Sequence, residues 1–262
     1  MYSSVFKVLQ KNLSTKQLAE KFSATALVNS LLREWDGFEI EDNEIVFRNK
    51  HKALSIALEN YSRVGSHAYK NIFYRTTEGR KETLSFEIFT QELFQIINKE
   101  DRFHMLYPRI IESNRSLAEI LLYRKHDYDV LLKKKRLSFI DAEQALILGH
   151  NFHPCPKSKV EFKSHDHRLF APEFCGSFSL KWVLLKKEYF FQDNSNCFKD
   201  KRWCADLFEQ DHNSEFDNLY TPFPFHPWQF NKLKKNEKIT FSSRFNRSIF
   251  NRLRYCRVRW RS

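Results

Sequence analysis

Two histidines and two lysines are spaced so that they could bind an anion. His150 and His153 are three residues apart, and Lys157 and Lys159 follow them closely. Imidazole and ammonium groups donate hydrogen bonds to phosphate oxygens, so phosphate is the ligand that this set favours. The alternative is the end of a helix followed by solvated lysines. The spacing alone leaves both interpretations open.

The neighbouring residues indicate how this set would be presented. An apolar run at helical spacing covers residues 145–148 and is followed by Gly149. Glycine commonly takes the left-handed conformation just past a helix. Prolines at positions 154 and 156 stiffen the exit. We therefore expect a helix to end at Gly149 and both imidazoles to lie at one turn.

A second polar pair lies in the segment PFPFHPWQ, residues 222–229. Three prolines in six positions favour an extended backbone, and they leave His226 and Gln229 as polar groups beside aromatic side chains. Residues 178–184 alternate in polarity before this segment and predict a strand. Between the two, residues 192–218 predict a loop around a short helix at 203–208.

Composition restricts the class of protein. A chain of 262 residues with 42% hydrophobic residues can form one large domain or two modest ones. No apolar run approaches the roughly 20 residues that a membrane span needs, and the N-terminus lacks the apolar core of a signal peptide. Five cysteines without a CxxC pair indicate reduced thiols. We expect a cytoplasmic protein without a membrane partner.

The net charge of +12 is unevenly distributed. Residues 237–262 carry Lys238 and seven arginines against Glu237, or +7, so the other 236 residues carry 12 − 7 = +5. The tail also lacks a clean apolar period. Its composition is that of a different sequence joined on. A nucleic-acid-binding tail, a shifted reading frame and a truncated gene would all produce this pattern.

Periodicity predicts mainly helical structure in the first 150 residues. Ser14 and Gln17 form a capping-box pattern before a helix over residues 15–35. Ser138 with Asp141 is a similar cap before the apolar run. The other expected elements are a hairpin at 38–47, a strand at 66–75, and helices at 83–98 and 105–125. Lys133 to Arg136 is expected to be a solvated connector.

Three segments occur in an order that resembles a known family. They are GHNFHPCPKSK at residues 149–159, APEFCGSFSLKW at 171–182 and PFPFHPWQ at 222–229. Together they are similar to the IucA/IucC family of siderophore synthetases, with a good match over roughly residues 140–231. The resemblance implies an α+β fold like a cupped hand. Residues 1–150 would be a helical thumb-like region, 151–236 a β-rich fingers-like region, and 237–262 a basic tail in place of the palm.

The resemblance also implies an activity. Such enzymes use ATP and Mg²⁺ to activate citrate or a related carboxylic acid as an acyl adenylate, which an amine, hydroxylamine or alcohol then attacks. His150, His153, Lys157 and Lys159 would line the nucleotide phosphate site, with His226 and Gln229 close to the same cleft. The expected partners are a nucleotide and a small acid such as citrate. Family members are often dimeric.

The sequence departs from the family pattern in four places. Asn151 replaces a proline, Lys159 replaces the usual arginine, and Glu161 replaces a glycine. Lysine keeps the positive charge but lacks the two-pronged donor of arginine. The serine–arginine–threonine segment expected after HPWQ is missing. We therefore expect weak ATP binding, and no formation of AMP and pyrophosphate by the isolated chain.

Three other functions fit parts of the sequence. His150, His153 and Cys155, with His165 or His167, could bind a metal ion, but their spacing fits no common zinc pattern, so no metal site is assigned. The arginine-rich tail could bind nucleic acid, but no recognition motif accompanies it, so nucleic acid is not an expected partner. A catalytic Cys–His pair has no supporting motif, and the cysteines are interpreted as buried or incidental thiols.

Overall fold

The computed structural model describes residues 13–97, 100–124, 133–134, 136–159, 162, 164–186, 188 and 220–235. The chain divides into two units, Met1–Gly176 and Ser177–Ser262, and each is described by itself. Helices and antiparallel strands occur in both, which confirms the predicted α+β class. None of the described helices is long and apolar enough to cross a membrane.

The first helix of the described chain is α2, Thr15–Glu34. Its N-terminus has the predicted capping box: the Ser14 hydroxyl accepts from the backbone N–H of Gln17, and the Gln17 side chain accepts from the N–H of Ser14. Leu27 and Val28 are buried in the main core. Asn29 bonds both the Tyr69 hydroxyl and the carbonyl of His67 at 2.9 Å, which ties α2 to the neighbouring sheet.

The sheet has five antiparallel strands whose order follows the chain. They are β1 (Phe38–Glu41), β2 (Glu44–Arg48), β3 (Ala53–Asn60), β4 (Ala68–Thr77) and β5 (Arg80–Leu84). The β1–β2 turn places Asp42 and Asn43 at φ 43° and 64°. Two-residue hairpin turns need such positive φ values, and short polar side chains tolerate them. This confirms the hairpin predicted at 38–47.

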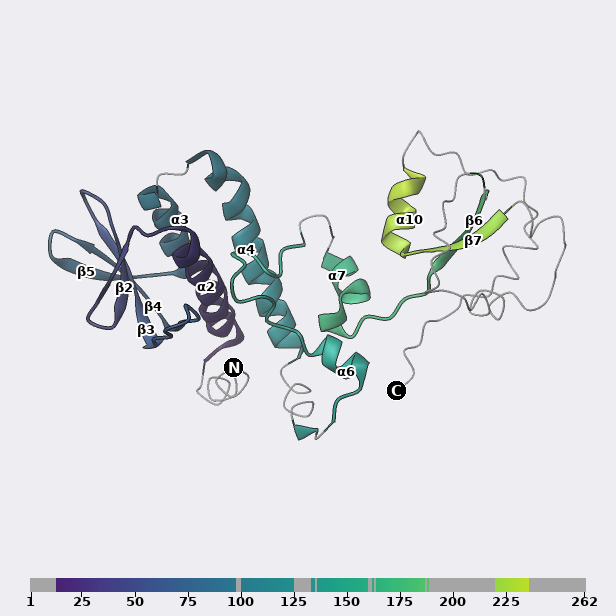
Figure 1. Cartoon of the computed structure of the whole chain (residues 1–262), viewed down its shortest axis with the longest axis horizontal. Helices are drawn as coiled ribbons and strands as arrows, with labels where there is room; N and C mark the ends of the chain where they lie inside the picture. The colour runs from purple at the N-terminus through teal and green to yellow at the C-terminus, as the bar shows by residue number, and fades with distance from the viewer. Residues whose placement is uncertain are drawn as a thin grey trace. The chain divides into compact units, whose positions relative to one another are not determined.

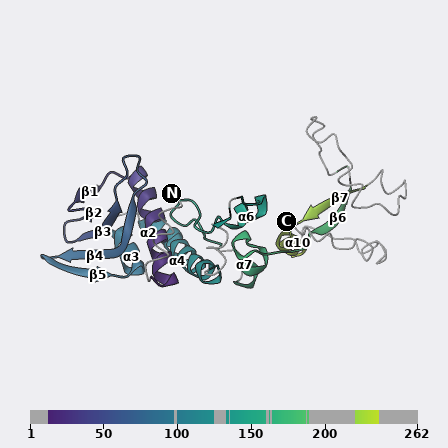
Figure 2. The ribbon, with the colours of Figure 1, turned by 90° about the horizontal axis from the view of Figure 1, so that it is seen from below.

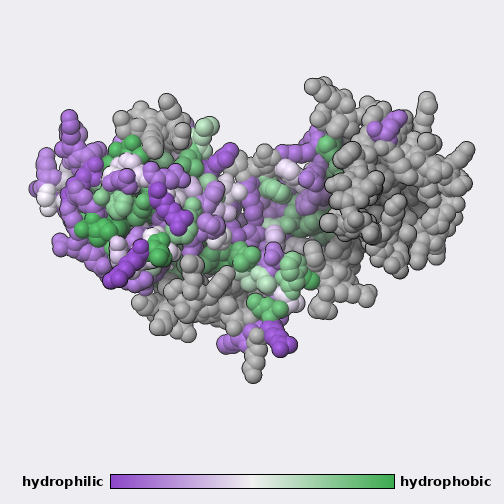
Figure 3. Space-filling model, viewed as in Figure 1, coloured by the Kyte–Doolittle hydropathy of each residue, from purple (hydrophilic) through white to green (hydrophobic). Residues whose placement is uncertain are grey.

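One face of the sheet forms the main core. The strand register places Ile45, Ile56, Phe73 and Leu84 side by side, and all four are buried. The helices α2 and α3 (Phe86–Ile97) cover this face, and α4 (Glu100–Tyr123) packs behind them (Figures 1 and 2). Hydrophilic side chains, purple in Figure 3, cover much of the surface over the sheet.

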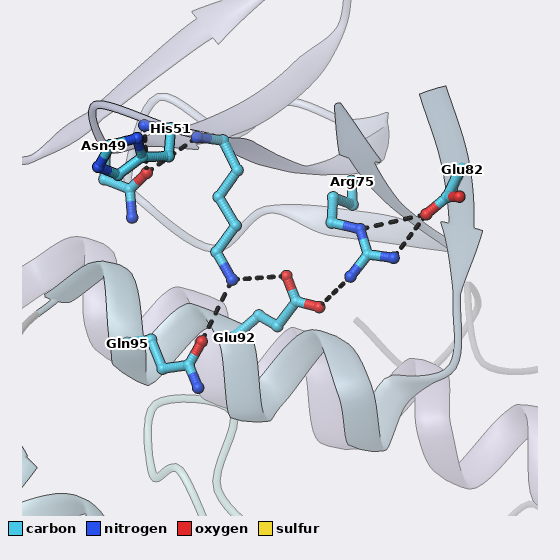
Figure 4. Close-up of polar contacts among 7 residues, drawn as sticks. Asn49, His51, Arg75, Glu82, Glu92 and Gln95 are labelled. Atoms are coloured by element: carbon cyan, nitrogen blue, oxygen red, sulfur yellow. Dashed lines mark hydrogen bonds and ion pairs between the residues drawn. The ribbon is translucent and has the colours of Figure 1, made fainter. Parts of the chain in front are cut away.

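An ion-pair network fastens α3 to the sheet (Figure 4). The Glu92 carboxylate accepts from Lys52 at 2.8 Å and from Arg75 at 2.5 Å. Arg75 also donates to Glu82 on β5, and Lys52 donates to Gln95 one turn further along α3. The Glu92 side chain is only 11% exposed, so the two cations compensate a carboxylate that would be costly to bury alone.

A smaller core lies at the other end of the first unit. It combines apolar residues of α2 and α4 with residues that follow them in the chain: Leu18, Ala19, Leu117, Ile120, Leu121, Ile147, Ala171 and Phe174. The short elements around this core are α6 (Phe139–Gln144), α7 (Ser164–Phe170) and the 3-10 helix η1 (Pro172–Phe174). Ser138 and Asp141 form the predicted capping box of α6.

In the second unit, β6 (Lys181–Lys186) pairs antiparallel with β7 (Tyr220–Phe225), and α10 (Pro227–Lys234) follows β7 directly. The predicted strand at 178–184 therefore begins three residues later than expected. Residues 222–225 are extended as predicted, but Gln229 lies in a helix. Pro227 occupies the first turn of that helix, where proline is well tolerated.

The structure differs from the sequence-based predictions in three further respects. The strands β3 and β5 were not predicted, and residues 83–84 belong to β5 rather than to the following helix. The larger sheet precedes residue 85, whereas the β-rich part was expected after residue 150. The division between units falls after Gly176. The predictions for 192–218 and 237–262 lie outside the described residues.

Candidate functional site: the 146–159 turn

The predicted helix before the histidines is shorter than expected. It ends at Gln144, and residues 146–148 lie outside it, although an apolar helix was expected to run to Gly149. The backbone carbonyls that would accept hydrogen bonds within a longer helix accept them from side chains of other segments instead. Arg124 donates to the carbonyl of Gln144 at 2.7 Å, and Lys157 donates to that of Leu146 at 2.7 Å. The chain therefore leaves the helix at Ala145 and turns.

Gly149 nevertheless has the left-handed conformation that was predicted, with φ 78°. A Cβ atom at this position would lie 2.7 Å from Cβ of Pro156 and 3.2 Å from Cε of Lys157. Glycine is therefore required for two reasons, the positive φ and the close return of the chain. The name "146–159 turn" is used below for the segment Leu146–Lys159.

Lys157 lies beneath this turn, with its side chain 7% exposed. Its ammonium donates to Oε1 of Glu173 at 2.7 Å as well as to the Leu146 carbonyl, and its backbone N–H donates to the Ser113 hydroxyl on α4 at 2.9 Å. Burial lowers the pKa of the Lys157 ammonium, and the neighbouring Glu173 carboxylate offsets part of that effect. Lys157 is thus in a buried ion pair.

Lys159 joins the same pair from its other side. Its ammonium donates to Oε2 of Glu173 at 3.2 Å, and its backbone N–H donates to the Glu112 carboxylate at 2.9 Å. Burial alone would raise the pKa of the Glu173 carboxyl, but Lys157 and Lys159 hold it below its ordinary value. One carboxylate therefore faces two cations, and the group has a net charge of +1.

His150 and His153 lie on the surface of the turn, and both are exposed. The Nδ1 atom of His150 accepts from the N–H of Phe152, and Nδ1 of His153 accepts from the N–H of Cys155, both at 3.2 Å. A ring nitrogen that accepts a hydrogen bond carries no proton, so the neutral rings carry theirs on Nε2. Each exposed imidazole therefore offers one N–H donor.

Phe152 anchors the turn on α2. The guanidinium carbon of Arg33 lies 3.5 Å from the centroid of the Phe152 ring, a cation–π contact. On the other side of the turn, the Cys155 side chain is part of the main core, where burial raises the pKa of its thiol. The turn is thus fixed from both sides, while its two imidazoles remain on the surface.

Four residues important for this geometry were not singled out from the sequence as site residues: Ser113, Arg124, Glu173 and Glu112. Arg124 is 1% exposed and donates to the carbonyls of both Gln144 and Glu173, which joins α6 to η1. Glu173 lies in the APEF segment that supported the resemblance, but no role was assigned to it. Glu173 pairs with Lys157, sixteen residues earlier in the chain, and a contact over that separation has no local sequence pattern that would predict it.

The metal-binding alternative gains no support in the described part of the chain. There, no three His, Cys, Asp or Glu side chains are grouped closely enough to hold a metal ion. His165 pairs with Asp166 at 3.1 Å, and His167 is buried and contacts the Phe162 ring. Cys155 faces the core rather than either surface imidazole. Glu161 lies outside the described residues.

The second unit repeats the histidine arrangement. His226 caps α10, and its Nδ1 accepts from the N–H of Trp228 at 3.1 Å. Its ring lies 4.4 Å from that of Phe178, and burial lowers the pKa of the imidazole. Gln229 is an exposed residue of α10. These two residues belong to a different unit from the 146–159 turn, so their expected place in the same cleft as His150 and His153 stays a prediction.

Comparisons with known proteins give a consistent result. The sequence model of the IucA / IucC family matches residues 138–247, which include the 146–159 turn, Glu173 and α10. The N(2)-citryl-N(6)-acetyl-N(6)-hydroxylysine synthase of Vibrio mimicus is 29% identical over 238 residues, 83% of this chain and 39% of the relative. The rhizobactin siderophore biosynthesis protein RhbC of Rhizobium meliloti is 31% identical over 136 residues, 48% of this chain and 23% of the relative.

The fold is also found among solved structures. The ATP-bound aerobactin synthetase IucA of Klebsiella pneumoniae aligns with a TM-score of 0.72 at 24% sequence identity, over 83% of this chain and 41% of that one. The chain spans about two fifths of the length of the Vibrio mimicus relative, 39%. The family model covers all three predicted motifs, so the predicted resemblance to the IucA/IucC family is confirmed over residues 138–247.

Proposed function

We propose that this chain contributes the phosphate-binding turn of an ATP-dependent ligase that joins citrate or a related carboxylic acid to an amine, hydroxylamine or alcohol in siderophore biosynthesis. One observation carries the proposal. Within the segment that matches the family, His150 and His153 are exposed on a turn whose ends are held by the buried Lys157–Glu173 pair. A Bacillus anthracis relative, 28% identical over 132 residues, is named spermidine-citrate ligase.

The turn suits an anion that gains charge during the reaction. When bound, ATP supplies the adenylyl group that activates the carboxylate, and Mg²⁺ offsets the charge of its phosphates. The exposed Nε2–H groups of His150 and His153 would donate to phosphate oxygens. Fixed donors of this kind are most effective when they need no rearrangement as charge develops.

Lys157 and Lys159 contribute in a different way. Their ammonium groups are bonded to Glu173, and the Glu112 carboxylate accepts from the Lys159 backbone N–H. The two lysines would therefore support the turn through these bonds rather than offer an unpaired charge to the anion. His226 and Gln229 remain candidates for the same site through the family resemblance, and Mg²⁺ has no assigned ligand among the described side chains.

Binding of pyrophosphate and of ATP with Mg²⁺ to the full chain tests the proposal. Isothermal titration of the wild type should give saturable binding. The double variant His150→Ala/His153→Ala should weaken it by roughly tenfold or more for each lost donor, since a hydrogen bond to a charged group contributes about 1.5–3 kcal/mol. His51→Ala is the matched control, because His51 is an exposed histidine of the same unit far from the turn in sequence. Equal affinities for all three chains would reject this site.

A further inference from the structure

We propose that Glu173 is a positioning residue of the anion site: its carboxylate holds Lys157 in a buried ion pair, and that pair fixes the turn from which His150 and His153 donate. This inference rests on the proposed function, since it assigns roles within the same phosphate site. Lys157, which the resemblance implied to be a direct phosphate ligand, is then a residue that supports the turn.

The first argument is the way in which Lys157 is used. Two of its three ammonium N–H groups donate to Oε1 of Glu173 and to the Leu146 carbonyl, both at 2.7 Å. Its side chain is 7% exposed and that of Glu173 is 10% exposed. A phosphate that replaced Glu173 would have to enter this buried position and leave the carboxylate paired with Lys159, whose ammonium lies farther away at 3.2 Å. Separating a buried ion pair is costly because neither charge regains its hydration.

The second argument is what the Lys157 ammonium connects. Leu146 precedes the two histidines and Lys157 follows them, so the bond from the ammonium to the Leu146 carbonyl joins the two ends of the turn. The Lys157 backbone N–H is in turn bonded to Ser113 of α4. Glu173 keeps the ammonium charged and directed at this position. The conformation of the segment between residues 146 and 157 therefore depends on a carboxylate that does not belong to it.

The third argument is the state of the imidazoles. Both Nδ1 atoms accept backbone N–H groups within the turn, from Phe152 and from Cys155. These bonds hold the rings in the tautomer with the proton on Nε2 only while the turn keeps its conformation. Loss of the support would free Nδ1 and let the rings exchange between tautomers. Glu173 would thus affect anion binding without contacting the anion, because it keeps the ring proton of His150 and His153 on Nε2.

The substitution Glu173→Gln separates the two roles of Lys157, because they predict opposite signs. If Lys157 were a direct phosphate ligand restrained by Glu173, removal of the carboxylate charge would release the ammonium and tighten pyrophosphate binding. If Glu173 positions the turn, the same substitution weakens binding. We expect a loss on the order of tenfold, comparable with outer-shell partners of bound ions. Glu59→Gln is the matched control, because Glu59 pairs with the well-buried Lys21 elsewhere in the unit.

The experiment combines pyrophosphate titration with ¹⁵N spectra of the histidine rings in the ligand-free chain. The wild type should show the Nε2–H tautomer at His150 and His153, Glu173→Gln should show exchanging tautomers at both, and His51 should be unchanged. If Glu173→Gln fails to fold, Lys157→Met with Glu173→Leu removes both charges together, a change that buried pairs commonly tolerate. That chain should show the same ring exchange and weakened binding.

The outcomes distinguish this inference from the proposed function. Tighter or unchanged pyrophosphate binding in Glu173→Gln, or unaltered ring spectra in that variant, would overturn the positioning role and leave the phosphate site standing. No pyrophosphate binding by the wild type, together with altered ring spectra in Glu173→Gln, would overturn the proposed function and support the positioning role.

Discussion

Arg33, in the last turn of α2, stacks its guanidinium on the ring of Phe152, 3.5 Å from the ring centroid. The two residues are more than a hundred positions apart, and their contact fixes the 146–159 turn against the helix that also forms the main core. The same turn is bonded to α4 through Ser113. The candidate site is therefore built on two helices, although its imidazoles lie on a loop.

Removing this contact should loosen the turn without unfolding the unit. We expect Arg33→Gln to lower the free energy of unfolding by about 0.5–1 kcal/mol, the range for cation–π contacts at accessible positions. Arg33→Lys should lose less, because the lysine ammonium can also lie over the Phe152 ring. Urea unfolding measures the effect, and Arg63→Gln is the control because Arg63 is exposed in the same unit. Equal losses from both glutamine substitutions would show that the contact contributes nothing.

Gly149→Ala should be costly because a methyl group meets Pro156. Gly65 is a close comparison for the backbone term, since its φ of 79° matches the 78° of Gly149 and no atom lies within 4 Å of the position that a Cβ would take there. Both alanine substitutions should lose about 1–2 kcal/mol from the left-handed conformation. Gly149→Ala should lose additional stability because its methyl group meets Pro156. It should also change the ring signals of His150 and His153, whereas Gly65→Ala should not. Equal losses for the two variants in thermal unfolding would contradict the close approach.

Acid should weaken the pair at Glu173. Burial alone would raise the pKa of this carboxyl, but Lys157 and Lys159 hold it below the ordinary 4.5, so the folded chain binds this proton less tightly than the unfolded chain. The resulting stability is present above the unfolded pKa and is lost as the pH falls through the folded one. Between about pH 5 and pH 2, the unfolding free energy of the wild type should therefore fall more steeply than that of Lys157→Met/Glu173→Leu. Parallel curves from urea titrations would argue against the pair.

The two described cysteines should differ in reactivity. Cys155 is buried and burial raises the pKa of its thiol, whereas Cys175 is exposed. Since the thiolate is the reacting species, alkylation of Cys155 should be slow in the folded chain and should become fast in urea. Iodoacetamide labelling followed by peptide mass spectrometry measures each thiol separately. Faster labelling of Cys155 than of Cys175 in the native chain would disprove its burial.

Local signals were enough to predict several elements correctly. The capping boxes at Ser14 and Ser138 mark the starts of α2 and α6, and the pair Asp42–Asn43 marks the β1–β2 turn. At the two capping boxes the serine side chain accepts from a backbone N–H three residues away, and at the turn Asp42 and Asn43 themselves take the positive φ values. A single sequence shows such relationships directly.

The strand β3 was missed although Leu54, Ile56 and Leu58 alternate with Ser55, Ala57 and Glu59 in the sequence, a pattern that predicts a strand. Residues 54–58 are all buried, and β3 lies between β2 and β4 in the sheet. Ser55 also donates to Glu44 on the adjacent strand. The strand β5 is mostly polar and exposed, with Leu84 its one buried residue.

The candidate site was predicted only in part. His150 and His153 were recognised by residue type, and the structure places both on one exposed turn. The buried position of Lys157 depends on Glu173, on the carbonyl of Leu146 and on Ser113, three groups from separate stretches of the chain. Sequence spacing gives the charge of a lysine, but only the fold shows whether that charge faces water or a carboxylate.

The strand order of the sheet has a consequence for how the protein is made. Since β1 to β5 pair in the order of synthesis, each strand finds its partner in the segment that left the ribosome just before it. Such short-range pairings have a small loop-closure cost and favour rapid assembly. The 146–159 turn, by contrast, needs α2, α4 and η1 at once. In pulse-labelled refolding, amides of β2 to β4 should thus gain protection from hydrogen exchange before those of the turn, so that the nascent chain forms its sheet before its candidate site.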